Sequence, residues 1–134
     1  MRLENKVALI TGAAGLLGKQ HAIAVLESDG NVVLTDIDSA KLKILESELF
    51  SEYDSSRIHI FQMNVCSAEN IREVSNTLEH LSTRIDILIN NAAIDPKFDS
   101  SSSGEETSRF ENLTLNEWDR QIAVGLTGAF LCSQ

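Results

Sequence analysis

The fold of this chain is predicted by the stretch Val7 to Gly18, which reads V-A-L-I-T-G-A-A-G-L-L-G. A β-branched and apolar run leads into three glycines, Gly12, Gly15 and Gly18, spaced three residues apart. This pattern is typical of a strand, a tight turn and a helix start, where backbone N–H groups and the positive end of the helix dipole can face a phosphate. Glycine-rich turns also occur for geometric reasons alone, so residues further along the chain have to distinguish the two interpretations.

Length and charge exclude several classes of protein. The chain has 134 residues, 43% of them hydrophobic, which is enough for one domain and one core over residues 1–134. Eleven Lys and Arg against twenty Asp and Glu give a net charge of -9, which disfavours nucleic acid and anionic membrane surfaces as partners. The apolar run near the start is too short for a signal peptide or a membrane span, so we expect a cytoplasmic protein.

The cysteines and histidines predict no metal site. Cys66 and Cys132 have no metal-ligand spacing and are expected to be reduced, structural thiols. The three histidines, His21, His59 and His80, are scattered along the chain.

Apolar runs and apolar stripes alternate after the glycine turn. Helical spacing is expected in Lys19–Ser28, in a segment after Asp38 or Ser39 with Leu42, Leu45 and Leu49 on one face, and in a segment opened by Ser67 to Asn70 with Ile71, Val74, Leu78 and Leu81 on one face. Further strands are expected at Val32–Thr35, Ile58–Phe61 and Ile85–Ile89. The alternation predicts an α/β fold, an incomplete Rossmann-like doubly wound parallel sheet of about four strands with helices on both faces.

Polar or small residues stand where the predicted strands end. Gly12, Asp36, Asn64 and Asn90 all occupy such positions, and ligands of this fold class bind at the carboxyl ends of the strands. Asp36 lies 18 residues after Gly18, where a carboxylate can accept hydrogen bonds from both hydroxyls of an adenosine ribose. With no Lys or Arg in residues 13–17 or next to Asp36, the pattern favours NAD over NADP. A helix-capping or surface role for Asp36 is the alternative.

The last third of the chain divides into a loop and a helix. Residues 95–112 are rich in Ser, Gly and Glu and predict a long, mobile loop, which is either an active-site flap or disordered. From Thr114 to Gln134 a capping box, Thr114 with Glu117, opens an amphipathic helix with Trp118, Ile122, Leu126 and Ala129 along one face. Gly125 and Gly128 interrupt this helix and predict a bend or close packing.

From Lys6 to Gln134 the chain resembles the short-chain dehydrogenase/reductase family. The family's glycine turn matches Thr11 to Gly18, and its ribose-binding acid matches Asp36. The family's adenine-contacting pair matches Asn64-Val65, and its N-N-A-G motif matches Asn90-Asn91-Ala92-Ala93. The resemblance implies cofactor contacts from Gly12, Gly15, Leu16, Leu17, Gly18, Asp36, Ile37, Asn64, Val65, Asn90, Asn91 and Ala92. It also implies hydride transfer between NAD(P) and an alcohol or carbonyl substrate, including sugar-derived ones, and a homo-oligomer formed through the 114–134 helix.

Three departures from the family pattern qualify these expectations. Leu16 stands where ordinary members have glycine, and the spacing Gly12, Gly15, Gly18 is that of the extended members. The family's catalytic asparagine aligns with Gly125, which has no side chain, and the family's catalytic Ser and Tyr-x-x-x-Lys would follow Gln134. The single tyrosine, Tyr53, has no lysine four residues later and is expected to be structural. We therefore expect a truncated chain that supplies the cofactor-binding half, contains no catalytic residue and is inactive alone.

Two other functions stay open at this point. One is a non-catalytic module that binds NAD, and the other is a sugar-nucleotide epimerase or dehydratase. The loop that begins Asp95-Pro96-Lys97-Phe98 faintly resembles oxidoreductases of bacterial flagellin modification.

Overall fold

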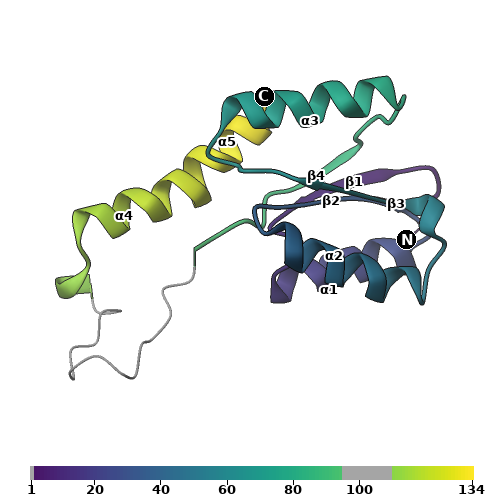
Figure 1. Ribbon diagram of the computed structural model, residues 1–134, viewed down its shortest axis with the longest axis horizontal. Coiled ribbons are helices and arrows are strands. Elements are labelled where there is room, and N and C mark those ends of the chain that lie inside the picture. The colour runs from purple at the N-terminus through teal and green to yellow at the C-terminus, as the bar shows by residue number, and fades with distance from the viewer. Residues whose placement is uncertain (1, 95–109) are drawn as a thin grey trace.

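The computed structural model describes residues 2–94 and 110–134, which form an α/β unit around one parallel sheet (Figure 1). The strands are β1 (Val7–Thr11), β2 (Asn31–Asp36), β3 (Ile58–Gln62) and β4 (Ile87–Ile89), in the spatial order β3-β2-β1-β4. The chain therefore moves outward from β1 to β3 and then returns to the other side of β1. This reversal confirms the predicted doubly wound arrangement and places the topological switch point between β1 and β4.

Helices cover both faces of the sheet, as predicted (Figure 1). Helices α1 (Leu16–Glu27) and α2 (Ser39–Phe50) lie on one face, and α3 (Ala68–His80) lies on the other, next to α5 (Gly128–Cys132). Strands β1, β2 and β3 each contribute side chains to two separate cores. Ala8 and Ile10 of β1 belong to the core under α1 and α2, whereas Val7 and Leu9 pack into the core under α3.

Most helix starts agree with the sequence, and the differences have local causes. Asp38 caps α2 by accepting from the N–H groups of Ala40 and Lys41, as expected of one of the two candidate caps. Helix α1 begins at Leu16, three residues before the predicted start at Lys19, because the turn closes at Gly15.

The start of α3 agrees with the predicted capping box only in part. Ser67 caps α3 through the N–H of Asn70. The side chain of Asn70 does not complete a capping box, because it accepts instead from the backbone N–H of Asn64 at 2.7 Å.

One predicted core position and one predicted strand start are wrong around the end of α3. Leu81 is 53% exposed because α3 ends at His80 and Leu81 is its C-cap, where the chain leaves the helix. Strand β4 starts at Ile87 rather than Ile85, although Ile85 still packs against the second core. The Tyr53 side chain packs against the first core, in agreement with a structural role, and burial raises the pKa of its hydroxyl.

The C-terminal helical segment consists of α4 (Leu115–Ile122), a π-helical turn η3 (Ala123–Thr127) and α5. Its predicted capping box is confirmed, with Thr114 and Glu117 bonded reciprocally. The predicted packing face is wrong, since Trp118 and Leu126 are 46% and 65% exposed. The buried Gly128 and the half-buried Val124 and Cys132 form the face that meets the sheet side of the molecule, because they are spaced four residues apart.

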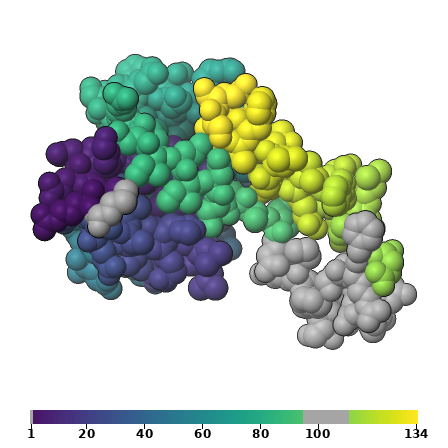
Figure 2. Space-filling model, turned by 180° about the vertical axis from the view of Figure 1, so that it is seen from behind, coloured from purple at the N-terminus to yellow at the C-terminus, as the bar shows by residue number. Residues whose placement is uncertain are grey.

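The two glycines of this segment differ. A Cβ on Gly128 would lie 2.8 Å from Val65 Cγ2, so close packing is confirmed there. A Cβ on Gly125 would meet nothing within 4 Å, so close packing is wrong at that position among the described residues. Figure 2 shows why: α5 lies against α3, whereas α4 extends away from the body of the molecule.

The predicted loop 95–112 lies outside the described residues except for its end, where Phe110–Asn112 form a short 3₁₀ turn. None of the helices in the described ranges is both long enough and apolar enough to cross a membrane. Both cysteines are free: Cys66 is exposed, which does not fit the expected structural role, and Cys132 packs against the second core. Burial raises the pKa of the Cys132 thiol.

Candidate cofactor site

A cleft of about 650 Å³ opens at the carboxyl ends of the strands. Ten of the twelve predicted contact residues line it: Gly12, Gly15, Leu16, Leu17, Asp36, Ile37, Asn64, Val65, Asn91 and Ala92. They come from the ends of all four strands and from the start of α1. The cleft therefore lies where the topology places ligands in an open α/β sheet.

The glycine turn is held against the end of β4 by close backbone contact. Gly12 has a φ of +62°, and a Cβ there would lie 2.8 Å from Ala92 Cα. A Cβ on Gly18 would lie 2.6 Å from Ala13 Cα, where the first turn of α1 crosses the turn. Glycine is therefore required at both positions, at Gly12 for conformation and space and at Gly18 for space.

The start of α1 presents backbone donors to this cleft. Gly15 is the N-cap and makes no side-chain cap hydrogen bond, and the first turn of the helix contains no acidic residue. The N–H groups of Leu16, Leu17 and Gly18 thus have no intrahelical acceptor, and they add to the positive end of the helix dipole. Three unbonded donors at a helix start form an anion-binding arrangement.

Asp36 lies beside this turn at the end of β2. Its Oδ2 accepts from the N–H of Ala14 at 3.1 Å, and its Oδ1 accepts from the N–H of Asp38 at 3.0 Å. A carboxylate offers about four lone-pair sites, so both oxygens can accept further hydrogen bonds. Asp36 therefore fixes the turn and still presents acceptors to the cleft.

Asn64 and Val65 form the next part of the wall. Asn64 Oδ1 accepts from the N–H of Cys66 at 3.0 Å, and its own N–H donates to Asn70 Oδ1. These bonds fix the segment between β3 and α3. Asn64 lines the cleft, and its amide oxygen has a second lone pair that can accept a further hydrogen bond.

A residue to which the sequence patterns assigned no role of its own joins β1 to β4. Thr11 is 1% exposed, and its Oγ1 accepts from the N–H groups of Asn91 and Ala92, each at 3.0 Å. In return Asn91 Nδ2 donates to the carbonyls of Thr11 and Gly12, each at 3.0 Å. The sequence feature that could have pointed to this role is the position of Thr11 at a strand end, directly before the glycine turn.

Two predicted contact residues do not line the cleft. Gly18 packs within the turn, and Asn90 Nδ2 donates to Ser133 Oγ on the C-terminal segment at 3.3 Å. Their cofactor contacts remain predictions.

Tertiary structure adds basic side chains that the local sequence did not place there. Lys41 on α2 and Arg120 on α4 both line the cleft, as do Ile94 and Val124. Lys41 Nζ lies 3.3 Å from Asp38 Oδ2, and the backbone hydrogen bond from Lys41 to Asp38 is the main cause of the lowered pKa of that carboxyl. Asp36 therefore shares the cleft with two basic side chains, although no basic residue is next to it in the sequence.

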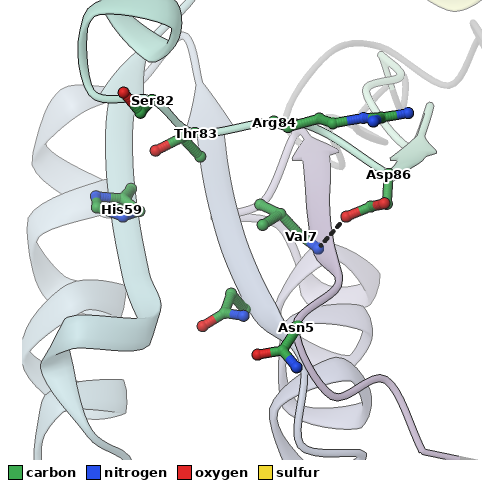
Figure 3. Close-up of a pocket in the computed structure, with 8 residues that line it drawn as sticks. Asn5, Val7, His59, Ser82, Thr83, Arg84 and Asp86 are labelled. Atoms are coloured by element: carbon green, nitrogen blue, oxygen red, sulfur yellow. Dashed lines mark hydrogen bonds between the residues drawn. The ribbon is translucent and has the colours of Figure 1, made fainter.

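A second hollow, of about 400 Å³, lies at the opposite edge, where the strands begin (Figure 3). The Arg84 side chain points away from His59, and Asp86 is bonded to the N–H of Val7 at 3.1 Å. These polar groups do not converge on one point, so the carboxyl-end cleft is the better candidate site. Within residues 2–94 and 110–134, no three His, Cys, Asp or Glu side chains are grouped to hold a metal ion.

Comparison with known proteins agrees with this geometry. A family model described as short chain dehydrogenase matches residues 6–134. The (2S)-[(R)-hydroxy(phenyl)methyl]succinyl-CoA dehydrogenase subunit BbsD of Thauera aromatica is 34% identical over the whole of this chain and 49% of its own length. The 3-oxoacyl-[acyl-carrier-protein] reductase FabG of Aquifex aeolicus is 28% identical over the whole of this chain and 50% of its own length.

Solved structures show the same fold. A short chain dehydrogenase from Bacillus anthracis has a TM-score of 0.78 and 32% identity, over 96% of this chain and 48% of that one. A 3-ketoacyl-(acyl-carrier-protein) reductase from Brucella melitensis complexed with NADH has a TM-score of 0.76 and 27% identity, over 97% of this chain and 48% of that one. The chain spans about half the length of the curated relatives it matches. By its sequence match, its sheet order and the geometry of its cleft, it belongs to the short-chain dehydrogenase/reductase family.

Proposed function

We propose that this chain is the cofactor-binding part of an NAD-dependent oxidoreductase. The observation that carries the proposal is that one cleft combines the unbonded N–H groups at the start of α1 with the Asp36 carboxylate. A dinucleotide has a pyrophosphate that the N–H groups can bind and ribose hydroxyls that the carboxylate can bind. When bound, NAD accepts a hydride from an alcohol, and NADH donates one to a carbonyl.

Each part of the cleft has a partner on such a cofactor. The N–H groups of Leu16 and Leu17 would bind the pyrophosphate, and Asp36 would bind the adenosine ribose. Asn64 and Val65 would contact the adenine, with the free lone pair of Asn64 Oδ1 accepting from its amine.

NAD is the proposed cofactor because Asp36 would repel a 2′-phosphate. Two unit charges 4 Å apart repel by about 4 kcal/mol at an effective dielectric constant near 20. Lys41 offsets part of this repulsion, but its ammonium is already paired with Asp38.

The substrate is proposed to be an alcohol or carbonyl compound, including sugar-derived ones. One relative, 29% identical over 99% of this chain, is a D-threitol dehydrogenase of Mycolicibacterium smegmatis. No residue of this chain is assigned a catalytic role, because Gly125 occupies the place of the family's catalytic asparagine and no Tyr-x-x-x-Lys occurs. We expect residues 1–134 alone to bind cofactor without turnover. The epimerase alternative is not favoured, because the family model and the relatives named above are dehydrogenases and reductases.

We further propose a cytoplasmic homo-oligomer that forms through the 114–134 helix. Large apolar side chains on this helix are exposed, among them Leu115 at 73%, Leu126 at 65% and Phe130 at 61%. A second copy could cover them, since apolar stripes on a protruding helix are typical of an interface.

Titration calorimetry with NAD and NADP tests the cofactor proposal. NAD should bind more tightly, and Asp36→Asn should weaken NAD binding about thirtyfold, since hydrogen bonds to a charged group contribute about 2 kcal/mol. Asp86→Asn is the matched control, because it removes the same charge at the opposite edge of the sheet. Equal or tighter NADP binding by the unmodified chain would refute the choice of NAD.

A further inference from the structure

We propose that Asp38 sets the cofactor preference by holding Lys41 in an ion pair, which keeps this lysine from binding a 2′-phosphate. This inference rests on the proposed function, because it concerns the ribose end of the same cleft. It assigns a specificity-determining role to two residues outside the predicted contact set.

A continuous series of contacts links the ribose-binding acid to this pair. The Asp38 N–H donates to Asp36 Oδ1 at 3.0 Å. Asp38 Oδ1 accepts from the N–H of Lys41 at 3.1 Å, and Asp38 Oδ2 lies 3.3 Å from Lys41 Nζ. A ribose held by Asp36 would therefore lie next to both members of the ion pair.

Lys41 is placed so that its ammonium can pair with either the Asp38 carboxylate or a phosphate bound in the cleft. It lines the cofactor cleft together with Asp36, and it also lines a smaller hollow of about 240 Å³ with Ala14, Gly15 and Leu16. Its side chain is 65% exposed, so its four-carbon stem is free to turn. Exposed ion pairs of this kind are weak, so removing the pairing should raise phosphate binding by a modest factor.

The charges at this end of the cleft favour an unphosphorylated ribose. The Lys41 ammonium is paired with Asp38, so a phosphate dianion beside Asp36 would meet that carboxylate without a free Lys41 ammonium to offset it. If Asp38 becomes neutral, Lys41 has the phosphate as its remaining partner.

Asp38→Asn makes this change without removing the helix cap. Asparagine is as favourable an N-cap as aspartate, so the start of α2 should stay intact. Asp38→Ser is a second variant that preserves the cap and should behave in the same way.

Glu48→Gln is the matched control. Glu48 Oε2 pairs with Lys19 Nζ at 2.7 Å, so this variant also frees a lysine and changes the net charge by the same amount. Lys19 lines the smaller hollow but not the cofactor cleft. A general charge effect would act equally in both variants.

The test is titration of the full chain and its variants with NAD and NADP, with thermal unfolding as a check of folding. Asp38→Asn should raise the NADP association constant about five- to tenfold and change that of NAD less than twofold. Glu48→Gln should change both less than twofold, and Lys41→Gln added to Asp38→Asn should abolish the gain.

Equal gains in Asp38→Asn and Glu48→Gln, or a gain that persists without Lys41, would overturn the inference. If NAD binds the unmodified chain but neither cap-preserving variant gains NADP affinity, this inference alone fails. If NAD does not bind the unmodified chain, the proposed function fails, and this inference fails with it.

Discussion

Alanine at the two glycines of the C-terminal helical segment should change stability in opposite directions. Gly125 and Gly128 are three residues apart, yet their surroundings differ. A Cβ on Gly125 would meet no atom within 4 Å, whereas a Cβ on Gly128 would lie 2.8 Å from Val65 Cγ2 and 3.0 Å from Val65 Cβ. Gly128 and Val65 are both buried.

The size of each effect depends on two opposing contributions. Replacing a helical glycine by alanine stabilises by about 0.4–1 kcal/mol, because the unfolded chain loses freedom. At Gly125 nothing opposes this stabilisation, because the new methyl group would meet no other atom of the described residues within 4 Å. At Gly128 overpacking costs about 1–3 kcal/mol, and the β-branched Val65 cannot rotate away easily, so the net loss should be about 1–2 kcal/mol.

Thermal unfolding followed by circular dichroism measures both effects. At about 3–4 °C per kcal/mol for a domain of this size, Gly125→Ala should raise Tm by about 2–3 °C and Gly128→Ala should lower it by about 3–7 °C. The variant Val65→Ala provides the control, because it makes room for the new methyl group. The stability lost in Val65→Ala plus the stability lost in Gly128→Ala should exceed the stability lost in the double variant.

A stabilising Gly128→Ala would refute the argument, since it would mean that Val65 does not limit the space. A destabilising Gly125→Ala would refute the open helical surroundings inferred for that position.

Three further predictions each concern a side chain that holds local structure through hydrogen bonds. Thr11→Val should lower the free energy of unfolding by about 2 kcal/mol in urea titrations, because two backbone N–H groups lose their shared acceptor; no loss would mean that water replaces it. Thr114→Ala should lower the helix content and cost about 1 kcal/mol by loss of the capping box, whereas Thr114→Ser should retain most of the stability. The hydrogen bond from Lys6 holds the pKa of Asp86 below its usual value, so the stabilisation by Asp86 is present at neutral pH and is lost as pH falls below about 4. Asp86→Asn should therefore reduce the difference in unfolding free energy between pH 7 and pH 3, and an unchanged difference would contradict this account.

Local patterns were sufficient for the parts of the fold that local chemistry decides. The strands and helices up to residue 94 lie within a few residues of their predicted positions, because apolar periodicity and caps such as Asp38 act over one or two turns. The C-terminal segment is where this reasoning failed. Its apolar residues are spread around the helix, so periodicity alone could not show whether Leu126 or Val124 meets the core.

The cofactor cleft likewise has features that local sequence determined and features that only the fold determined. The sequence by itself determined the glycine turn, the acid at Asp36 and the polar strand ends, since parallel strands bring their carboxyl ends to one edge in any doubly wound sheet. Only the tertiary structure decided that Lys41 reaches the cleft, that Thr11 joins β1 to β4, and that Asn90 turns toward Ser133. These contacts depend on how helices and strands far apart in the chain are placed in space, and no short-range pattern encodes that placement.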